Sequence, residues 1–132
     1  MEMVGLVIVS HSPDISKGLK TMLSEAQPEV TVIDAGGTDE KEMGTSAIKI
    51  QQAIEQANKG KGVAVLVDFG SSVMNAEMAI DMLDEEVQNQ VKIADAPLIE
   101  GAYSAVMEAG FGKEVLEVVK AAEKAKNTNK IN

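Results

Sequence analysis

Residues 4–13 read VGLVIVSHSP, an apolar run that ends in a short polar turn and a proline. The run is apolar throughout and does not alternate, which is typical of a strand buried on both faces of a parallel sheet. Ser12 and Pro13 suit the N-cap and the first position of a helix. This stretch therefore predicts a strand that passes through a short turn directly into a helix.

The rest of the chain repeats this alternation of short apolar runs and helical segments. Further strands are expected at residues 30–33, 62–67 and 91–93. Apolar residues at helical spacing predict helices over residues 15–23, 48–57, 73–87, 102–109 and 113–126. The order predicts an α/β fold of three layers, αβα, with a doubly wound and mainly parallel sheet of four to five strands. We expect one domain over residues 1–126 and a frayed polar tail over residues 127–132.

The composition narrows the classes of protein to consider. Hydrophobic residues make up 45% of the 132 residues and aromatic residues only 2%, which favours a helix-and-sheet core over a β-sandwich. The chain has no cysteine, which excludes disulfides, thiolate catalysis and cysteine-based zinc sites. A net charge of -9 without any arginine argues against a nucleic-acid surface and leaves backbone, hydroxyl and lysine groups to hold a phosphate. No apolar run is long enough to cross a membrane, so we expect a cytoplasmic protein. We expect neither a metal nor a cofactor.

His11, the only histidine, lies in the turn between the first expected strand and the helix that follows. The free N–H groups and positive dipole of a helix N-terminus favour an anion, which suits a nitrogen that receives a phosphoryl group. A polar residue that merely ends a strand would look the same. The carboxyl end of the first strand is where a doubly wound sheet binds its ligands, so both interpretations stand at this point.

The loop after the second expected strand is rich in glycine and hydroxyl groups. It contains Gly37 and Thr38, and Thr45 and Ser46 stand before the next helix. Glycine permits close approach of the backbone to a phosphate, and either Thr45 or Ser46 could be the N-cap and a phosphate donor. A turn followed by an ordinary N-cap would explain most of the same pattern.

The loop after the third expected strand reads DFGSS over residues 68–72. Asp68 could accept the Nδ1–H of His11, which would fix the tautomer and leave Nε2 free to attack, or it could simply end its strand. Ser71 and Ser72 stand at the start of the following helix and are further candidates to bind phosphate. The three loops together predict a phosphoryl-transfer site at one edge of the sheet.

These motifs resemble the mannose-type IIA domains of the sugar phosphotransferase system. The resemblance covers nearly the whole chain and rests on VIVSHS at 7–12, AGGTD at 35–39 and LVDFGSS at 66–72. It implies that the carrier HPr phosphorylates His11 on Nε2, that Asp68 holds the imidazole, and that the protein is a homodimer. The Gly-Gly-Thr loop is most similar to the branch that serves dihydroxyacetone kinase. In that branch the acceptor is ADP, bound to the nucleotide-binding subunit of the kinase.

Other interpretations of the same residues remain open. A sugar-transport IIA domain would pass phosphate to a IIB partner, but that branch has a tryptophan near the third loop and this chain has none. A receiver domain phosphorylated on Asp68 would need acidic residues after the first strand to bind Mg²⁺, and a histidine phosphatase would use arginines. A noncatalytic regulatory domain of the same fold would bind partners through its helices. Three methionines at helical spacing could serve such an interface or the core, and the spacing favours the core for most of them: Met74, Met78 and Met82.

Overall fold

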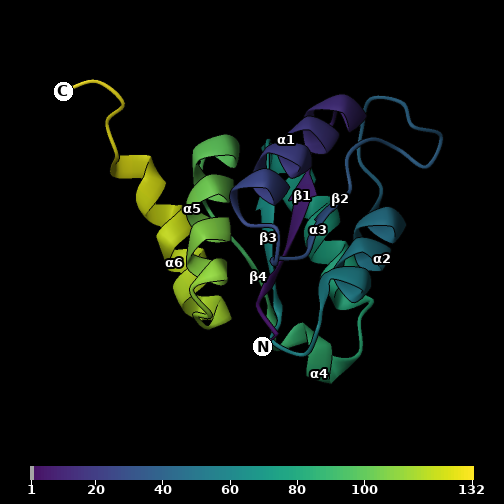
Figure 1. Cartoon of the computed structure of the whole chain (residues 1–132). Coiled ribbons are helices and arrows are strands. Elements are labelled where there is room, and N and C mark those ends of the chain that lie inside the picture. Colours follow the sequence, from purple (N-terminus) through teal and green to yellow (C-terminus); the bar gives the residue numbers. More distant parts are fainter. Residues whose placement is uncertain (1) are drawn as a thin grey trace.

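The computed structural model describes residues 2–132, which form a parallel sheet between two layers of helices (Figure 1). The sheet has four strands in the order β2-β1-β3-β4. Their bounds are Gly5–Val9 for β1, Val32–Asp34 for β2, Val63–Val67 for β3 and Val91–Ile93 for β4. All the neighbouring strands pair in parallel. The predicted α/β fold is confirmed, with the smaller of the two expected strand numbers.

Helices cover both faces of the sheet, as Figure 1 shows. One layer consists of α1 (Pro13–Ala26), α5 (Leu98–Gly110) and α6 (Val115–Glu123), and the other of α2 (Ala47–Ala57) and α3 (Gly70–Asp81). The short helix α4 (Glu85–Gln88) and the 3₁₀ turn η1 (Lys124–Asn127) complete the helical elements.

Alternate residues of β1 divide between two apolar cores. Leu6 and Ile8 belong to the core under α1, α5 and α6, whereas Val7 and Val9 belong to the core under α2 and α3. Every residue of β1 is buried. A strand covered on both faces requires an apolar side chain at every position, which explains the unbroken run at the start of the chain.

The prediction of one continuous helix over residues 73–87 is wrong. α3 ends at Asp81, and α4 begins at Glu85. The amides of Met82 and Leu83 donate to carbonyl groups three residues back, at 3.2 and 3.0 Å. These bonds tighten the last turn and carry Leu83 into the core, so the helix cannot continue in its original direction.

Met74 and Met78 of α3 are exposed, as is Met82 at its C-cap, so the expectation that most of these methionines lie in the core is wrong. The exposed fractions of Met74, Met78 and Met82 are 66%, 55% and 44%. The face of α3 that contacts the sheet is made instead of small residues, including the fully buried Ala76 and Ala79. Small side chains let the helix lie close to the strands, and the long methionine side chains point away from them.

The direction of winding reverses between β1 and β3. β2 pairs with one side of β1, and β3 pairs with the other. The crevice outside the carboxyl ends of the two central strands is where α/β proteins of this kind bind ligands. His11 follows β1 and Asp68 follows β3, so the topology brings both residues to this crevice.

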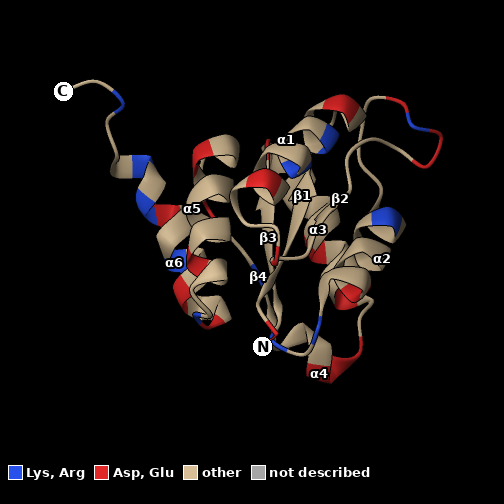
Figure 2. Cartoon of the chain, in the orientation of Figure 1, with Lys and Arg blue, Asp and Glu red and all other residues tan. Residues whose placement is uncertain are grey.

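Most charged residues lie on the helices and loops, with lysines and acids interspersed (Figure 2), and Asp34 and Lys92 lie in the edge strands β2 and β4. Within residues 2–132, none of the helices combines the length and the apolar character needed to cross a bilayer.

Candidate active site

His11 and Asp68 lie side by side at the carboxyl ends of the two central strands. Nδ1 of His11 is 3.1 Å from Oδ1 of Asp68 and 3.3 Å from Oδ2, and the amide of His11 donates to Oδ2 at 2.9 Å. The two side chains are 25% and 13% exposed. An ionised carboxylate only accepts hydrogen bonds, so in the neutral imidazole Nδ1 carries the proton and Nε2 keeps its lone pair. This is the arrangement of an imidazole prepared to attack through Nε2.

The carboxylate of Asp68 is held in its ionised form. Burial alone would raise its pKa, but hydrogen bonds from Ser72, His11 and Phe69 lower the pKa from 3.8 to about 2. The Ser72 hydroxyl donates to Oδ1 at 2.6 Å, and the Phe69 amide donates to the same oxygen at 2.7 Å. Asp68 is therefore an anion near neutral pH, and it can stabilise the positive charge that an imidazole gains when Nε2 accepts a phosphoryl group.

Nε2 of His11 meets the first turn of α3. The hydroxyl oxygen of Ser71 is 2.7 Å from Nε2, and since Nε2 has no proton, the hydroxyl donates to it. The N-cap of α3 is Phe69, which makes no side-chain hydrogen bond to the helix. The amide of Ser72 donates to the carbonyl oxygen of Phe69 at 2.9 Å, so the amides of Gly70 and Ser71 and the positive dipole of α3 are the groups that favour an anion beside Nε2. The position of Ser71 suits the role of phosphate ligand that the sequence predicts for it.

Ser72 lies on the Asp68 side of the imidazole. Its side chain is fully buried, its hydroxyl donates to Oδ1 of Asp68, and its oxygen is 3.3 Å from Nδ1 of His11. A buried hydroxyl whose proton is on a carboxylate has no proton left for a phosphate on Nε2. This position favours a contact with Asp68, and the binding of phosphate by Ser72 stays a prediction.

Gly37 and Thr38 lie in the loop between β2 and α2, and their polar groups form hydrogen bonds with nearby backbone groups. The amide of Gly37 donates to the carbonyl oxygen of Ser10 at 3.0 Å, and that of Thr38 to the carbonyl oxygen of Glu42 at 2.9 Å. The hydroxyl oxygen of Thr38 accepts from the Glu42 amide at 3.1 Å. Gly37 has a φ of 79°, a left-handed conformation that favours glycine. Both residues shape the loop, and their binding of phosphate stays a prediction.

Thr45 and its neighbours fasten the end of this loop to the site. Ser46, rather than Thr45, is the N-cap of α2. The hydroxyl oxygen of Thr45 accepts a hydrogen bond from the side-chain amide of Asn75 in α3. The amide of Gly44 donates to the carbonyl oxygen of His11 at 2.8 Å. Thr45 thus links the loop to α3, and its role as a phosphate ligand also stays a prediction.

Exposed apolar side chains around His11 are functional candidates that the sequence interpretation missed. They come from four separate segments and form the apolar collar: Ile15, Met43, Phe69 and Ile99. Together with His11 they line a shallow cavity of about 330 Å³. Phe69 is 67% exposed, and its ring centroid is 5.4 Å from that of His11. The one signal in the sequence was an aromatic residue directly after Asp68, in a loop where a core position is not expected.

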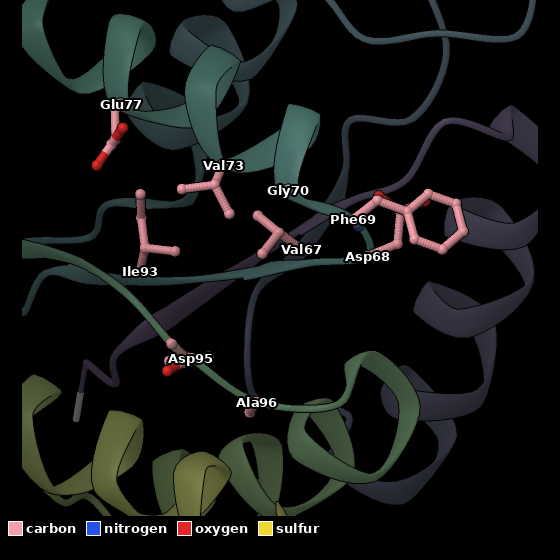
Figure 3. Close-up of a pocket in the computed structure, with 10 residues that line it drawn as sticks. Val67, Asp68, Phe69, Gly70, Val73, Glu77, Ile93, Asp95 and Ala96 are labelled. Carbon is pink, nitrogen blue, oxygen red and sulfur yellow. Dashed lines mark hydrogen bonds between the residues drawn. The ribbon is translucent and has the colours of Figure 1, made fainter.

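A second cavity, of about 450 Å³, lies between α3 and the segment that follows β4 (Figure 3). Asp68 and Phe69 lie at one end of it, with the ring of Phe69 turned away, and Glu77 and Asp95 lie toward the other end. In the part of the chain that the structure describes, no group of three or more His, Cys, Asp or Glu side chains is arranged to hold a metal ion. Glu77 and Asp95 lie apart from Asp68 in this cavity (Figure 3).

The family model for EIIA-man, described as the PTS system fructose IIA component, matches residues 5–120. The chain belongs to this family. The match includes β1 and β3, His11 and Asp68, so the resemblance inferred from the three loops is confirmed. The topology described above, with helices on both faces of a parallel sheet, is thus the topology of an EIIA-man domain.

Within the EIIA-man family, the chain groups with the DhaM subunits. It is 39% identical over 115 residues to the PTS-dependent dihydroxyacetone kinase, phosphotransferase subunit DhaM, of Lactococcus lactis, with 86% of this chain and 89% of the relative covered. It is 36% identical over 107 residues to a phosphoryl donor subunit DhaM of Listeria innocua, with 80% and 86% covered. The DhaM of Providencia stuartii is 34% identical over 127 residues, and this chain spans only 27% of its length.

Solved structures show the same fold. A crystal structure of a protein of unknown function has a TM-score of 0.88 and 32% identity, with 100% of both chains covered. The EIIA component from Streptococcus agalactiae has a TM-score of 0.63 at 17% identity, with 95% of this chain and 93% of that chain covered. At the lower identity the likeness shows the fold alone.

Proposed function

We propose that the chain is a phosphohistidine carrier, the phosphoryl donor subunit of a dihydroxyacetone kinase. In this proposal, Nε2 of His11 accepts a phosphoryl group from HPr and passes it to ADP in the nucleotide-binding subunit, which forms ATP for the phosphorylation of dihydroxyacetone. The observation that carries the proposal is the pairing of Nδ1 with an ionised carboxylate, which leaves Nε2 as the nucleophile. The DhaM relatives, named as phosphoryl donor subunits of dihydroxyacetone kinases, support the choice of kinase.

The first transfer begins with attack of the Nε2 lone pair on the phosphorus of phospho-HPr. A new N–P bond forms at Nε2 as the N–P bond to the donor breaks, and the electron pair of the broken bond returns to the donor. The His11 ring then carries a positive charge, with its proton still on Nδ1. Asp68, 3.1 Å away, stabilises this charge without accepting the proton, since its hydrogen bonds hold the pKa of its carboxyl at about 2.

Before this attack, the hydroxyl of Ser71 must leave the lone pair of Nε2. A small rotation would let the same hydroxyl donate to an oxygen of the incoming phosphoryl group, joined by the amides of Gly70 and Ser71 at the start of α3. The chain has no arginine to neutralise phosphate, so hydroxyl and backbone donors fill that role. In the second transfer a β-phosphate oxygen of ADP attacks phosphorus, and the electron pair returns to Nε2.

The apolar collar supports the proposal that His11 reacts with protein-bound partners. Ile15, Met43, Phe69 and Ile99 are each more than half exposed, and they lie around a histidine whose side chain is only 25% exposed. A partner that brings phosphorus within bonding distance of Nε2 must cover these side chains. Burial of large exposed apolar groups at the centre of an interface contributes most of the binding free energy in many complexes.

We also propose a homodimer, on the basis of the family, and light scattering of the purified protein tests it.

The proposal is tested by mixing the protein with phosphoenolpyruvate, enzyme I and HPr. We expect one acid-labile phosphate per chain and none in the His11→Ala variant, whose circular dichroism should match the wild type. Labelling that persists in His11→Ala would overturn the assignment of His11. Addition of the ADP-loaded nucleotide-binding subunit of dihydroxyacetone kinase should then remove the label and form ATP. Transfer to a IIB protein in place of ADP would assign the chain to sugar transport.

A further inference from the structure

Ser72 contacts both members of the His11–Asp68 pair, from a position that solvent does not reach. Its hydroxyl oxygen is 2.6 Å from Oδ1 of Asp68 and 3.3 Å from Nδ1 of His11, and the residue has an exposed fraction of 0%. It is the third residue of α3, where its side chain reaches back over the first turn of the helix to the end of β3. Its contacts differ from those of Ser71, which meets Nε2 on the exposed side of the ring.

The single proton of the Ser72 hydroxyl can go to the carboxylate or, in the tautomer that leaves Nδ1 without a proton, to that ring nitrogen. The carboxylate is closer and charged, and hydrogen bonds to a charged acceptor are the stronger kind. The proton therefore lies on the side of Asp68, and the oxygen of Ser72 presents a lone pair to the imidazole. As a result, the atoms that face Nδ1 are all acceptors: Oδ1 at 3.1 Å, Oδ2 at 3.3 Å and the Ser72 oxygen at 3.3 Å.

We propose that Ser72 is a positioning residue that selects the reactive tautomer of His11 by committing its hydroxyl proton to Asp68. With only acceptors around it, Nδ1 must carry the proton, and the lone pair must stand on Nε2, where the transfer takes place. This inference rests on the proposed function for its consequence in phosphoryl transfer. The tautomer itself is a property of the unphosphorylated protein and is measured without any partner.

Removal of the Ser72 hydroxyl would loosen the pair in two ways. Asp68 would lose its closest donor at 2.6 Å and would keep only the His11 and Phe69 amides and the imidazole. The space left by the hydroxyl could admit a water molecule, which can donate to Nδ1 and so tolerate the other tautomer. His11 is the titratable group in contact with Asp68, whereas Glu77 of α3 and Asp95 after β4 line the neighbouring cavity.

The test compares Ser72→Ala with the wild type by nitrogen-15 and carbon-13 NMR of the unphosphorylated protein. The wild type should show the proton of neutral His11 on Nδ1, and Ser72→Ala should show a measurable population with the proton on Nε2. The Asp68 carboxyl should titrate about one pH unit higher in the variant. Labelling by limiting phospho-HPr should slow about tenfold, the equivalent of one hydrogen bond to a charged group. Ser72→Thr, which keeps a hydroxyl, should restore the tautomer and most of the rate.

Ser16→Ala is the matched control. Ser16 is likewise fully buried in the first turn of a helix, but its hydroxyl donates to the carbonyl oxygen of Pro13, at 3.0 Å. It should leave the His11 tautomer and the Asp68 titration unchanged. If Ser72→Ala keeps the wild-type tautomer and titration, the inference is overturned, whatever its rate of labelling. If the wild type itself accepts no phosphoryl group, the proposed function fails, while the NMR comparison still decides the role of Ser72.

Discussion

Asp68→Asn is the substitution that most directly tests how the pair works. The side chain keeps its size, but one of its two oxygens becomes an NH₂ group, which donates instead of accepting. In the wild type Oδ1 accepts from Ser72 and from the Phe69 amide, and Oδ2 accepts from the His11 amide at 2.9 Å. An asparagine cannot satisfy both sides. Its NH₂ group must face at least one N–H or O–H donor, or it must donate to Nδ1 and force the proton onto Nε2.

The expected magnitude follows from the carboxylate's own hydrogen bonds. At 1.36 kcal/mol per pH unit, the lowering of the Asp68 pKa from 3.8 to about 2 corresponds to about 2 kcal/mol. Screening by solvent at this partly exposed site reduces the figure to about 1–2 kcal/mol. The hydrogen bond between the charged carboxylate and the imidazolium is of similar strength, so its loss in the transition state slows labelling about 5- to 30-fold. A shift toward the wrong tautomer would slow it further, to about 100-fold.

The assay is a rapid-quench measurement of acid-labile phosphate with phospho-HPr in excess. We expect Asp68→Asn to reach one phosphate per chain, but at the lower rate. A rate equal to that of the wild type would refute the orienting role of Asp68, because nothing else in the site carries a negative charge next to Nδ1. Complete loss of labelling in a folded variant would also count against it, since Nε2 and the donors of α3 are still in place.

The same variant makes a prediction about stability and pH. The pKa of Asp68 is lowered in the folded state, so its contribution is fully present above its ordinary value of 3.8 and is lost as pH falls toward about 2. Near pH 7 the free energy of unfolding of Asp68→Asn should be lower than that of the wild type by about 1–2 kcal/mol. The difference between the two should shrink as the pH falls below 3.8. Urea unfolding at several pH values measures it.

Four further substitutions test other parts of the molecule. Ser71→Ala should slow labelling about fivefold while the His11 tautomer seen by NMR stays the same, since only the donor beside Nε2 is removed; an unchanged rate would remove Ser71 from the site. Phe69→Ala should raise the KM for phospho-HPr about fivefold, since a docked partner would cover the ring. It should change the free energy of unfolding by less than about 0.5 kcal/mol, because the ring is 67% exposed. The same KM as the wild type would exclude Phe69 from the docking surface. Gly5→Ala should cost about 3 kcal/mol, because a Cβ there would overlap the carbonyl oxygen of Ala57, whereas Gly18→Ala, with open space around it in α1, should gain about 1 kcal/mol. Thermal unfolding measures both glycine variants. A Gly5→Ala variant at least as stable as Gly18→Ala would contradict the close packing of β1 against α2.

The features of the site that depend on single loops next to strands can be predicted from the sequence. The apolar run at residues 4–9 predicts β1, and His11 and Asp68 can be paired in advance because parallel strands end at the same edge of the sheet. The two serines of residues 71–72 cannot be told apart in this way. Adjacent residues in the first turn of a helix point in directions about 100° apart, so one serine meets Nε2 and the other is buried against Asp68.

Other features depend on contacts between segments that are distant in the chain. Ile15, Met43 and Ile99 read as ordinary apolar residues of a helix, a loop and a helix, and only the folded chain brings them around His11. The helical spacing of Met74 and Met78 indicated core packing, but small alanines occupy the sheet-facing side of α3. Spacing shows that a helix has an apolar face, and it does not show which apolar face is covered.

The central pairing of β1 with β3 also has a consequence for how the protein folds. His11 and Asp68 are separated by 57 residues, and α1, β2 and α2 all lie between them. Closing so long a loop is slow compared with forming a helix, so the chain acquires its reactive histidine only after its non-local strand pairing is complete. On the proposed function, labelling by phospho-HPr should therefore appear later during refolding than helical circular dichroism.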